Sequence, residues 1–501
     1  MKKHRYPFIK KFSDHNGNYY IYDVHTNRIV EVNKIVYDII NFFDINSNDV
    51  IINKAQKLYD RKNLETAVTE IYSYITNHGI FLSDRPRVIE FGLSYDELKE
   101  KLENEVKGLT LNVTNNCNLS CRYCPYNEDN MSQEMRPKIN MEKDVALAAI
   151  DFFFRHNQRA RKENIIVSFY GGEPILNFEV IKACVEYVKS KYKDFCNNTH
   201  FIINTNGTLL DEDVISYLVT NNKVFLHISL DGPEAVHDGN RIYKDGSGTF
   251  KTIVRNLERI RQKDINYYEN CIALKPVIAP PFDLISLDNF FFENSEKFLK
   301  IDDSKIFFNY VFTYKIKYLN GFDIKKLKEK LRKQQNFVFG SFIRELTEKG
   351  FAKPSLGRKL MLDMLYKIYK RNYYSRLPEK WVFRSFCVPG GLKPFIDVDG
   401  KVGICESTGC ILDIGNIYND YDLEKIISII NKVMKICNQE CRTCWAIRFC
   451  NVCFAWLIYN DEIDLNKMHI MCSALKKALV RSFLWYVYIL KRNPKSLESL
   501  C

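Results

Sequence analysis

Apolar and polar positions alternate along the middle of the chain in a way that predicts strands and helices in turn. Short apolar runs, typical of buried strands, occur at residues 109–114, 164–169, 201–205, 223–230, 272–278 and 305–314. Amphipathic helical patterns lie between them at residues 142–155, 178–193, 211–220, 251–262 and 287–300. These strand–helix units predict an α/β fold, a parallel and partly closed (β/α)6 barrel over residues 108–314, with its site at the carboxyl ends of the strands.

The first 85 residues show a different pattern, which predicts a small separate domain. Apolar positions alternate with polar ones at residues 19–22 and 28–32, with a turn at 25–27, which indicates a hairpin. Helical patterns follow at residues 34–43, 50–59 and 64–78. Residues 86–107 are expected to link this domain (residues 1–85) to the barrel.

Positive charge gathers after the barrel. The chain has a net charge of +12, and residues 315–384 carry an excess of Lys and Arg, with helical patterns at residues 324–335 and 359–371. This basic helical bridge has three open interpretations: a solvated surface, a dock for an acidic peptide, or a nucleic-acid surface. No nucleic-acid recognition motif accompanies the charge, so we expect no nucleic-acid partner.

The ends of the chain carry no pattern typical of a signal or membrane segment. No apolar segment follows the first eight residues, and the longest C-terminal apolar run, residues 478–490, is interrupted by Arg481 and is too short to span a bilayer. The 16 cysteines of such a chain are typical of metal ligands rather than disulfides. We therefore expect a soluble cytoplasmic protein with no membrane partner, in which residues 476–501 form a C-terminal helix.

Three cysteines, Cys117, Cys121 and Cys124, follow the first predicted barrel strand with the spacing C-x3-C-x2-C. Three thiolates in one loop can hold three irons of a cubane cluster and leave the fourth iron open, and an open metal position is a reaction site. The alternative is a zinc knuckle or a group of buried thiols. Zinc takes four ligands, however, and no fourth Cys or His lies near in the sequence, the closest His being His156.

With Tyr123 directly before the third cysteine, this motif resembles the C-x3-C-x-(aromatic)-C signature of the radical S-adenosylmethionine (SAM) enzymes. The resemblance implies that Cys117, Cys121 and Cys124 ligate a [4Fe-4S] cluster whose open iron chelates the amino and carboxylate groups of SAM. One electron from the cluster then cleaves SAM to methionine and a 5′-deoxyadenosyl radical. That radical removes a hydrogen atom from an unactivated carbon.

Polar motifs after the next predicted strands agree with this resemblance. The run Gly171-Gly172-Glu173 matches the family's Gly-Gly-Glu motif, in which the glycines admit close approach of the backbone to the cofactor. The resemblance implies that Glu173 bonds the ammonium of the methionine part of SAM. By the same resemblance, the other SAM contacts are Asn206, Ser229 and Asp231 at the ribose and Arg241 at the carboxylate.

A second group of cysteines occupies residues 385–475. It begins with C-x12-G-x4-C and continues with two C-x2-C pairs, and it resembles the seven-cysteine SPASM extension of peptide-modifying radical SAM enzymes. That extension holds two auxiliary [4Fe-4S] clusters, while zinc ribbons, which also begin with C-x2-C pairs, are the alternative. The resemblance implies two ligand sets: Cys387, Cys405 and Cys453 for the first auxiliary cluster, and Cys441, Cys444, Cys450 and Cys472 for the second.

Two departures from the SPASM pattern bear on the first auxiliary cluster. Only two residues separate Cys450 from Cys453, where the family usually has three, and residues 382–386 contain no additional cysteine. Unless Cys410 serves as a ligand, one iron stays open, and a substrate thiolate could occupy it. Glu406 has two open interpretations, a base that takes a proton from the substrate or a solvated side chain.

Together these motifs favour a radical SAM peptide maturase. Residues 1–85 resemble the winged-helix elements that bind a leader peptide as an added strand. We expect a thioether between a cysteine sulfur and a carbon of a ribosomal precursor peptide, as made by sactipeptide and ranthipeptide synthases, with electrons from a flavodoxin- or ferredoxin-like protein. The alternatives are an anaerobic sulfatase-maturating enzyme, which forms formylglycine, and a zinc-dependent peptide- or nucleic-acid-binding module.

Metal analysis separates the enzyme from the zinc-binding module. Protein purified without oxygen is expected to contain abundant iron and acid-labile sulfide, because cysteine loops of this kind hold iron–sulfur clusters. Plasma emission spectrometry and a colorimetric sulfide assay measure both. Zinc as the sole metal would contradict the cluster interpretation.

Overall fold

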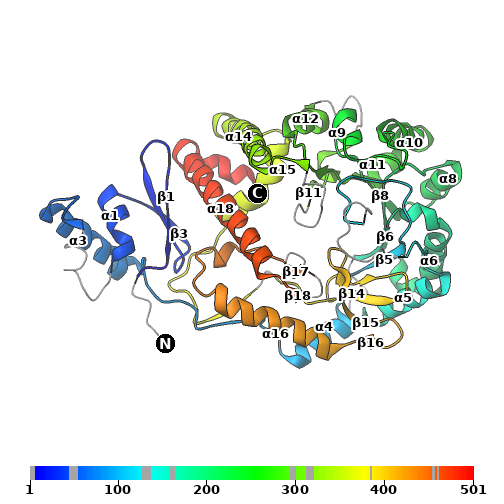
Figure 1. Cartoon of the computed structure of the whole chain (residues 1–501), viewed down its shortest axis with the longest axis horizontal. Helices are drawn as coiled ribbons and strands as arrows, with labels where there is room; N and C mark the ends of the chain where they lie inside the picture. Colours follow the sequence, from blue (N-terminus) through cyan, green and yellow to red (C-terminus); the bar gives the residue numbers. More distant parts are fainter. Residues whose placement is uncertain are drawn as a thin grey trace.

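Three regions follow one another along the chain: an N-terminal sheet with helices, a curved sheet wrapped by helices, and a group of long helices near the C-terminus (Figure 1). The start of the helix predicted at 50–59, the end of the helix predicted at 287–300 and the end of the strand predicted at 305–314 lie outside the described residues. The computed structural model describes residues 6–43, 55–126, 137–157, 164–293, 301–311, 321–383, 386–453, 457–459 and 462–500.

The N-terminal region is built on an antiparallel sheet of order β1-β2-β3. Because side chains alternate between the faces of a strand, Ile21 packs with the helices, whereas Tyr20 and Tyr22 face the rest of the molecule. Side chains of Asn33 and Asp60 cap the two α-helices at their N-termini. The elements are β1 (Ile9–Ser13), β2 (Tyr19–Asp23), β3 (Arg28–Val32), α1 (Lys34–Ile39), the 3₁₀ turn η1 (Ile40–Phe42) and α3 (Arg61–His78).

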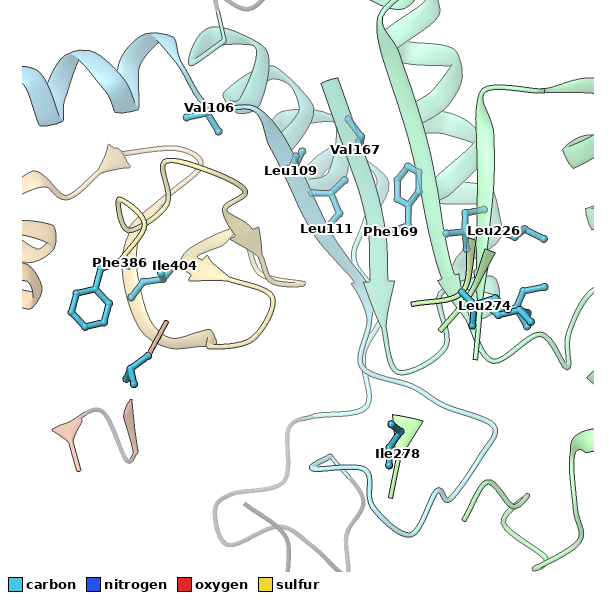
Figure 2. Packing of buried hydrophobic residues seen from close by; sticks show 14 of the residues in the cluster. Val106, Leu109, Leu111, Val167, Phe169, Leu226, Leu274, Ile278, Phe386 and Ile404 are labelled. Carbon is cyan, nitrogen blue, oxygen red and sulfur yellow. The ribbon is translucent and has the colours of Figure 1, made fainter. Parts of the chain in front are cut away.

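The central region is a parallel sheet of order β5-β6-β7-β8-β9 with helices along its outer side (Figure 1). Leu109 pairs in register with Val167 and Leu111 with Phe169, and all four are fully buried in the core (Figure 2). The strands are β5 (Gly108–Thr114), β6 (Ile165–Gly171), β7 (Thr199–Thr205), β8 (Val224–Ile228) and β9 (Ile272–Leu274). The main helices are α5 (Lys143–Arg155), α6 (Phe178–Lys191), α8 (Glu212–Thr220), α10 (Phe250–Lys263) and α11 (Ile265–Cys271).

The opposite face of the same sheet, its inner face, carries polar side chains. In register, Asn112 of β5 pairs with Tyr170 of β6, and Asn204 of β7 pairs with His227 of β8. Polar groups on a buried sheet face need hydrogen-bond partners or a ligand. The inner face is therefore the surface on which a bound group would be held.

The barrel sheet continues into the C-terminal third of the chain, which the sequence pattern did not predict. β13 (Phe395–Ile396) pairs in parallel with β5 and covers its edge, as an open strand edge requires. β14 (Lys401–Cys405), β15 (Gly409–Asn416) and β16 (Asp420–Tyr421) then add antiparallel strands. Over the described residues the sheet has nine strands in the order β16-β15-β14-β13-β5-β6-β7-β8-β9.

Two of the predicted barrel strands differ in the structure. The run at 272–278 divides into β9 and β10 (Val277–Ile278), because Pro276 has no N–H with which to continue the ladder. In its described part, the run at 305–314 pairs in parallel with the run at 272–278: Ile306 bridges Leu274 of β9, and β11 (Asn309–Tyr310) pairs with β10. The sixth predicted strand therefore lies beside the fifth in parallel, but both are short and interrupted.

Long helices and a linker complete the molecule. The linker holds β4 (Val88–Glu90) and α4 (Tyr95–Asn104), and β4 pairs with β12 (Lys380–Val382). Asn438 fixes this linker, because its side chain bonds both the N–H and the carbonyl of Ile89, at 2.8 and 2.6 Å. No helix among the described residues is long and apolar enough to cross a bilayer. The long helices are α14 (Ile324–Lys349), α15 (Leu356–Tyr369), α16 (Leu423–Glu440) and α18 (Leu465–Arg492).

Candidate functional site

The structure brings the cysteines of the C-x3-C-x2-C loop together at the carboxyl end of β5. The pKa of Cys121 is raised to about 12, chiefly by burial, with Cys124 and Cys117 contributing and Arg241 opposing the shift. Burial likewise raises the pKa of Cys117 to about 11, again with Cys124 contributing. Since the thiols act on one another electrostatically, they form one group. Such desolvated thiols favour deprotonation only when a metal centre compensates the charge.

The Gly-Gly-Glu turn at the end of β6 is packed against the backbone of the cysteine loop. Gly172 N–H donates to Thr114 O and Glu173 N–H donates to Asn116 O, both at 2.8 Å. A Cβ on Gly172 would lie 2.1 Å from Asn116 O, and Gly171 has a φ of 152° with Thr114 O 2.3 Å from its own Cβ position. Only glycine therefore permits this contact, which sets the position of the cysteine loop.

Glu173, expected at the SAM ammonium, is fully buried and bound to the end of β7. Its carboxylate accepts from the Thr205 hydroxyl and the Asn206 N–H, both at 2.7 Å, and from the Ile175 N–H at 3.1 Å. Burial raises the pKa of Glu173 to about 7, and these hydrogen bonds oppose that shift. The carboxylate thus ties β6 to β7 beside the cysteine loop. Its negative charge acts on Cys117 directly.

Asp231, expected at the ribose, gathers three other groups of the site. The Tyr123 hydroxyl and Arg241 Nε donate to one carboxylate oxygen, the latter at 2.9 Å, and Val277 N–H donates to the other at 2.9 Å. The Arg241 guanidinium also lies 5.4 Å from the centre of the Tyr123 ring. Asp231 is 2% exposed. It therefore orients Arg241 and the aromatic residue of the cysteine motif, a positioning role that the sequence did not indicate.

A chain of amides joins the cysteine loop to the end of β7. Asn206 Nδ2 donates to Asn118 Oδ1 at 2.9 Å, and Asn118 Nδ2 donates to the Thr208 hydroxyl at 2.8 Å. Asn118 lies between two of the motif's cysteines, a position that could have marked it in the sequence as part of the site. Ser229 is placed beside this network, where its N–H donates to Thr205 O at 3.0 Å.

The radical SAM superfamily pattern matches residues 111–276, the segment that runs from β5 to the end of β9. This chain contains a radical SAM domain. The match spans the cysteine loop, the Gly-Gly-Glu turn and the Asp231–Arg241 pair described above.

Relatives extend the similarity beyond the radical SAM domain. An uncharacterized protein of Methanocaldococcus jannaschii is 26% identical over 327 residues, 65% of this chain and 94% of that protein. The cysteine-type anaerobic sulfatase-maturating enzyme of Clostridium novyi is 29% identical over 160 residues, 31% of this chain and 40% of the relative. The radical SAM cyclopropyl synthase TigE of Paramaledivibacter caminithermalis is 25% identical over 293 residues, 56% of this chain and 57% of TigE. The alignments with these two enzymes thus cover about half of their lengths.

A solved structure shares the fold. Native anSMEcpe with bound AdoMet and the Cp18Cys peptide superposes with a TM-score of 0.53 at 19% identity, covering 78% of this chain and 99% of that one. The mixed α/β radical SAM fold is therefore shown for this chain.

Downstream of the radical SAM domain, the two predicted auxiliary cysteine sets each assemble in space. The pKa of Cys387 is raised to about 11 by burial, then by Cys453 and Cys405. The pKa of Cys450 is raised to about 12 by burial, with further contributions from Cys441, Cys444 and Cys472. Residues far apart in the sequence thus act on one another in the groupings that the SPASM resemblance implies.

The spacing of these thiols bears on what they could hold. Within the described ranges, no three His, Cys, Asp or Glu side chains converge as a single-ion site requires. A cubane instead takes one thiolate at each of several irons, so its sulfurs stand farther apart. The Cys410 thiol donates to Lys401 O at 3.3 Å. The buried Cys437, one helical turn before Cys441, lies against the second set and raises the pKa of Cys441.

The inner face of the sheet lies between the radical SAM loop and the first auxiliary set. Burial raises the pKa of Tyr170, and Glu406 and Cys124 raise it further, so its hydroxyl lies near both regions. Lys275 donates to Asn204 Oδ1 at 3.0 Å, and Glu406 acts on Lys275 electrostatically. Among the described residues, three buried polar atoms nearby have no hydrogen-bond partner: Thr110 Oγ1, Ser168 Oγ and His227 Nδ1. These orphaned atoms on the inner face are suited to hold a bound group or water.

The close contact at Gly172 makes a testable prediction. Gly172→Ala is expected to displace the cysteine loop, because the new Cβ would meet backbone atoms of Asn116 and Cys117 rather than a movable side chain. We expect SAM cleavage to fall by roughly 10²-fold, the cost of a displacement of about 1 Å at a reacting centre. Chromatographic quantification of 5′-deoxyadenosine under dithionite measures it. The matched control is Gly340→Ala in α14, where a Cβ meets nothing within 4 Å; equal losses in both variants would contradict the prediction.

Proposed function

We propose that this chain is a radical SAM maturase that links a cysteine sulfur to a carbon within a precursor peptide. Cys117, Cys121 and Cys124 would hold the SAM-binding [4Fe-4S] cluster, and the two C-terminal sets would hold auxiliary clusters. When bound, the first cluster and SAM supply a carbon radical that takes a hydrogen atom from the substrate. Gly171 and Gly172 hold the cysteine loop in place, and Asp231 orients Arg241, which would pair with the carboxylate of SAM.

The observation that carries the proposal is the unequal size of the two auxiliary sets. Cys441, Cys444, Cys450 and Cys472 supply four thiols, whereas the first set gathers three, with Cys410 engaged at Lys401 O. A cubane with three protein thiolates keeps one coordination position for an outside ligand. A substrate thiolate is the natural ligand for it. This arrangement would present the peptide sulfur beside the inner face of the barrel.

Glu406 is the side chain we propose as the proton acceptor. It follows Cys405, lies 3.6 Å from Lys393 Nζ, and acts electrostatically on Tyr170 and Lys275 of the inner face. Joining sulfur to carbon removes one hydrogen atom, one proton and one electron from the peptide. The hydrogen atom would pass to the SAM-derived radical and the proton to Glu406. The auxiliary centres would take up the electron and could return it to the SAM-binding cluster, where cleavage of SAM consumes one electron, while a flavodoxin- or ferredoxin-like donor would supply the first electron.

The N-terminal domain is proposed to hold the leader of the precursor peptide. β1 and β3 are the outer strands of the β1-β2-β3 sheet. Helix α18 packs on β1 through Phe12 and Phe483, and reaches β3 through the ion pair of Lys491 and Glu31. A leader peptide can add to β3 as a further antiparallel strand, with main-chain hydrogen bonds supplying affinity. The basic α14, with exposed Lys325, Lys326 and Lys328, offers an additional surface for acidic residues of a peptide.

A sulfatase-maturating activity is the second candidate, and two findings favour it. The sulfatase-maturating enzyme of Clostridium novyi is a relative, and anSMEcpe shares the fold over 78% of this chain. The remaining fifth of this chain has no counterpart there, which favours a substrate that needs an additional binding domain. The product distinguishes the two candidate activities, because a thioether link adds no carbonyl to the peptide, whereas formylglycine is an aldehyde.

Mass spectrometry of co-expressed precursor tests the proposal. A short cysteine-containing peptide encoded beside this gene is expected to lose a pair of hydrogens for each link. The linked cysteines should resist alkylation by iodoacetamide, because their sulfurs are bonded to carbon. The same peptide treated with a hydrazide reagent should not react. A hydrazide adduct would support the sulfatase-maturating alternative, and an unchanged mass would contradict both.

Glu406→Gln separates proton transfer from radical formation. The amide cannot accept the proton, so cross-linking is expected to fall by about 10²-fold. Formation of 5′-deoxyadenosine should continue, because Glu406 stands outside the SAM site. Glu424→Gln, an exposed residue at the start of α16, is the control. A Glu406→Gln variant with wild-type cross-link yield would show that Glu406 is only a solvated side chain.

A further inference from the structure

The hairpin turn between β2 and β3 is buried, although turns of this kind usually lie at the surface. Asp23 and His25 are 0% exposed and Asn27 is 5% exposed. The turn inserts between the end of α15, the segment that precedes β12, and the loop that carries Cys444 and Cys450. This contact involves the proposed peptide-holding domain and the proposed second auxiliary site.

Arg448 makes the central contact between the turn and the cysteine loop. It lies in the 3₁₀ turn Ile447–Phe449, between Cys444 and Cys450. Its Nε donates to Val24 O at 2.6 Å and its Nη2 donates to His25 O at 2.8 Å. Because a guanidinium carries its donors in a fixed plane, two carbonyls of one turn fix its orientation in a way that a lysine cannot reproduce.

Aromatic rings complete the contact around Arg448. The guanidinium lies 4.3 Å from the centre of the Tyr374 ring and 5.4 Å from that of Trp381. On the other side, the Tyr22 ring of β2 packs against Trp445 and Phe449 of the same cysteine loop, at 6.4 and 5.7 Å. The loop between Cys444 and Cys450 is thus held by the N-terminal sheet through both hydrogen bonds and ring packing.

The turn is itself held in place by hydrogen bonds, so it can fix the position of the Cys444–Cys450 loop. The Asp23 carboxylate accepts from the Thr26 N–H at 2.7 Å and the Phe81 N–H at 3.0 Å. Leu377 N–H donates to His25 Nδ1 at 3.1 Å, so Nε2 carries the proton that is donated to Asp84 O. Asn27 Nδ2 donates to Asn372 O at 3.0 Å and its φ of 61° fits the left-handed turn.

We propose that Arg448 is a positioning residue, which fixes the Cys444–Cys450 loop on the N-terminal turn and thereby holds the peptide-binding domain and the second auxiliary site in one arrangement. This inference rests on the proposed function for the identity of the auxiliary site. It makes the N-terminal domain part of the scaffold of that site, in addition to any role in binding a leader.

The test is Arg448→Lys in the full-length protein, reconstituted with iron and sulfide without oxygen. The lysine keeps the charge but loses one of the two carbonyl contacts, so the loop should lose its fixed orientation. We expect iron to fall from about twelve to about eight per chain, with sulfide in proportion, as one of three clusters is lost. Electron paramagnetic resonance should show that one auxiliary signal is missing. Formation of 5′-deoxyadenosine without peptide should remain at the wild-type level.

Two further variants make the result decisive. Arg442→Lys is the matched control, because Arg442 lies between Cys441 and Cys444 and, among the described residues, donates to Arg87 O of the linker rather than to the turn; it should keep all its iron. Asn27→Gly keeps the left-handed turn but removes its side-chain bonds, and it should lose the same auxiliary signal in part. Full iron in Arg448→Lys, or equal loss in Arg442→Lys, would overturn the inference. Wild-type protein with only one cluster would instead refute the auxiliary-cluster premise of the proposed function.

Discussion

Strand β5 is paired on both edges, and the rest of the molecule is arranged around that pairing. On one side lies β6, whose Gly-Gly-Glu turn packs against the loop that follows β5. On the other side β13 brings in the segment with Cys387 and Cys405. Main-chain hydrogen bonds fix the register of both neighbouring strands. The position of β5 therefore determines where the cysteine loop, the Gly-Gly-Glu turn and the segment with Cys387 and Cys405 lie.

The cost of burying polar groups explains the form of the site. Glu173, Asp231 and Arg241 are nearly inaccessible, and each is satisfied by hydrogen bonds to neighbouring strand ends. Such a fully connected network is rigid, because breaking one member leaves another buried group without a partner. The inner face differs, since Ser168 Oγ and His227 Nδ1 lack partners among the described residues. The rigid network therefore lies beside the cysteine loop, whereas the inner face keeps polar atoms that could still bond a further group.

Much of this could be predicted from the sequence because it depends on local patterns. The apolar runs placed β5, β6, β7 and β8 to within a few residues, since alternation and burial act over single strands. Pro276 also carried a local signal, and its missing N–H ended β9 before the predicted limit. The roles of Asn118 and Asp231 could not be predicted in the same way. Their partners lie tens of residues away, and only folding brings them within hydrogen-bond distance.

The sequence by itself determined the chemistry available to this protein, because the spacing of cysteines and glycines within a loop restricts what that loop can hold. The tertiary structure alone decided which distant polar side chains meet, such as Asn206 with Asn118. It also decided that the β2–β3 turn would be buried against Arg448. Both outcomes depend on long-range packing and desolvation, which act between surfaces that are not adjacent in the chain and leave no periodic signal in it.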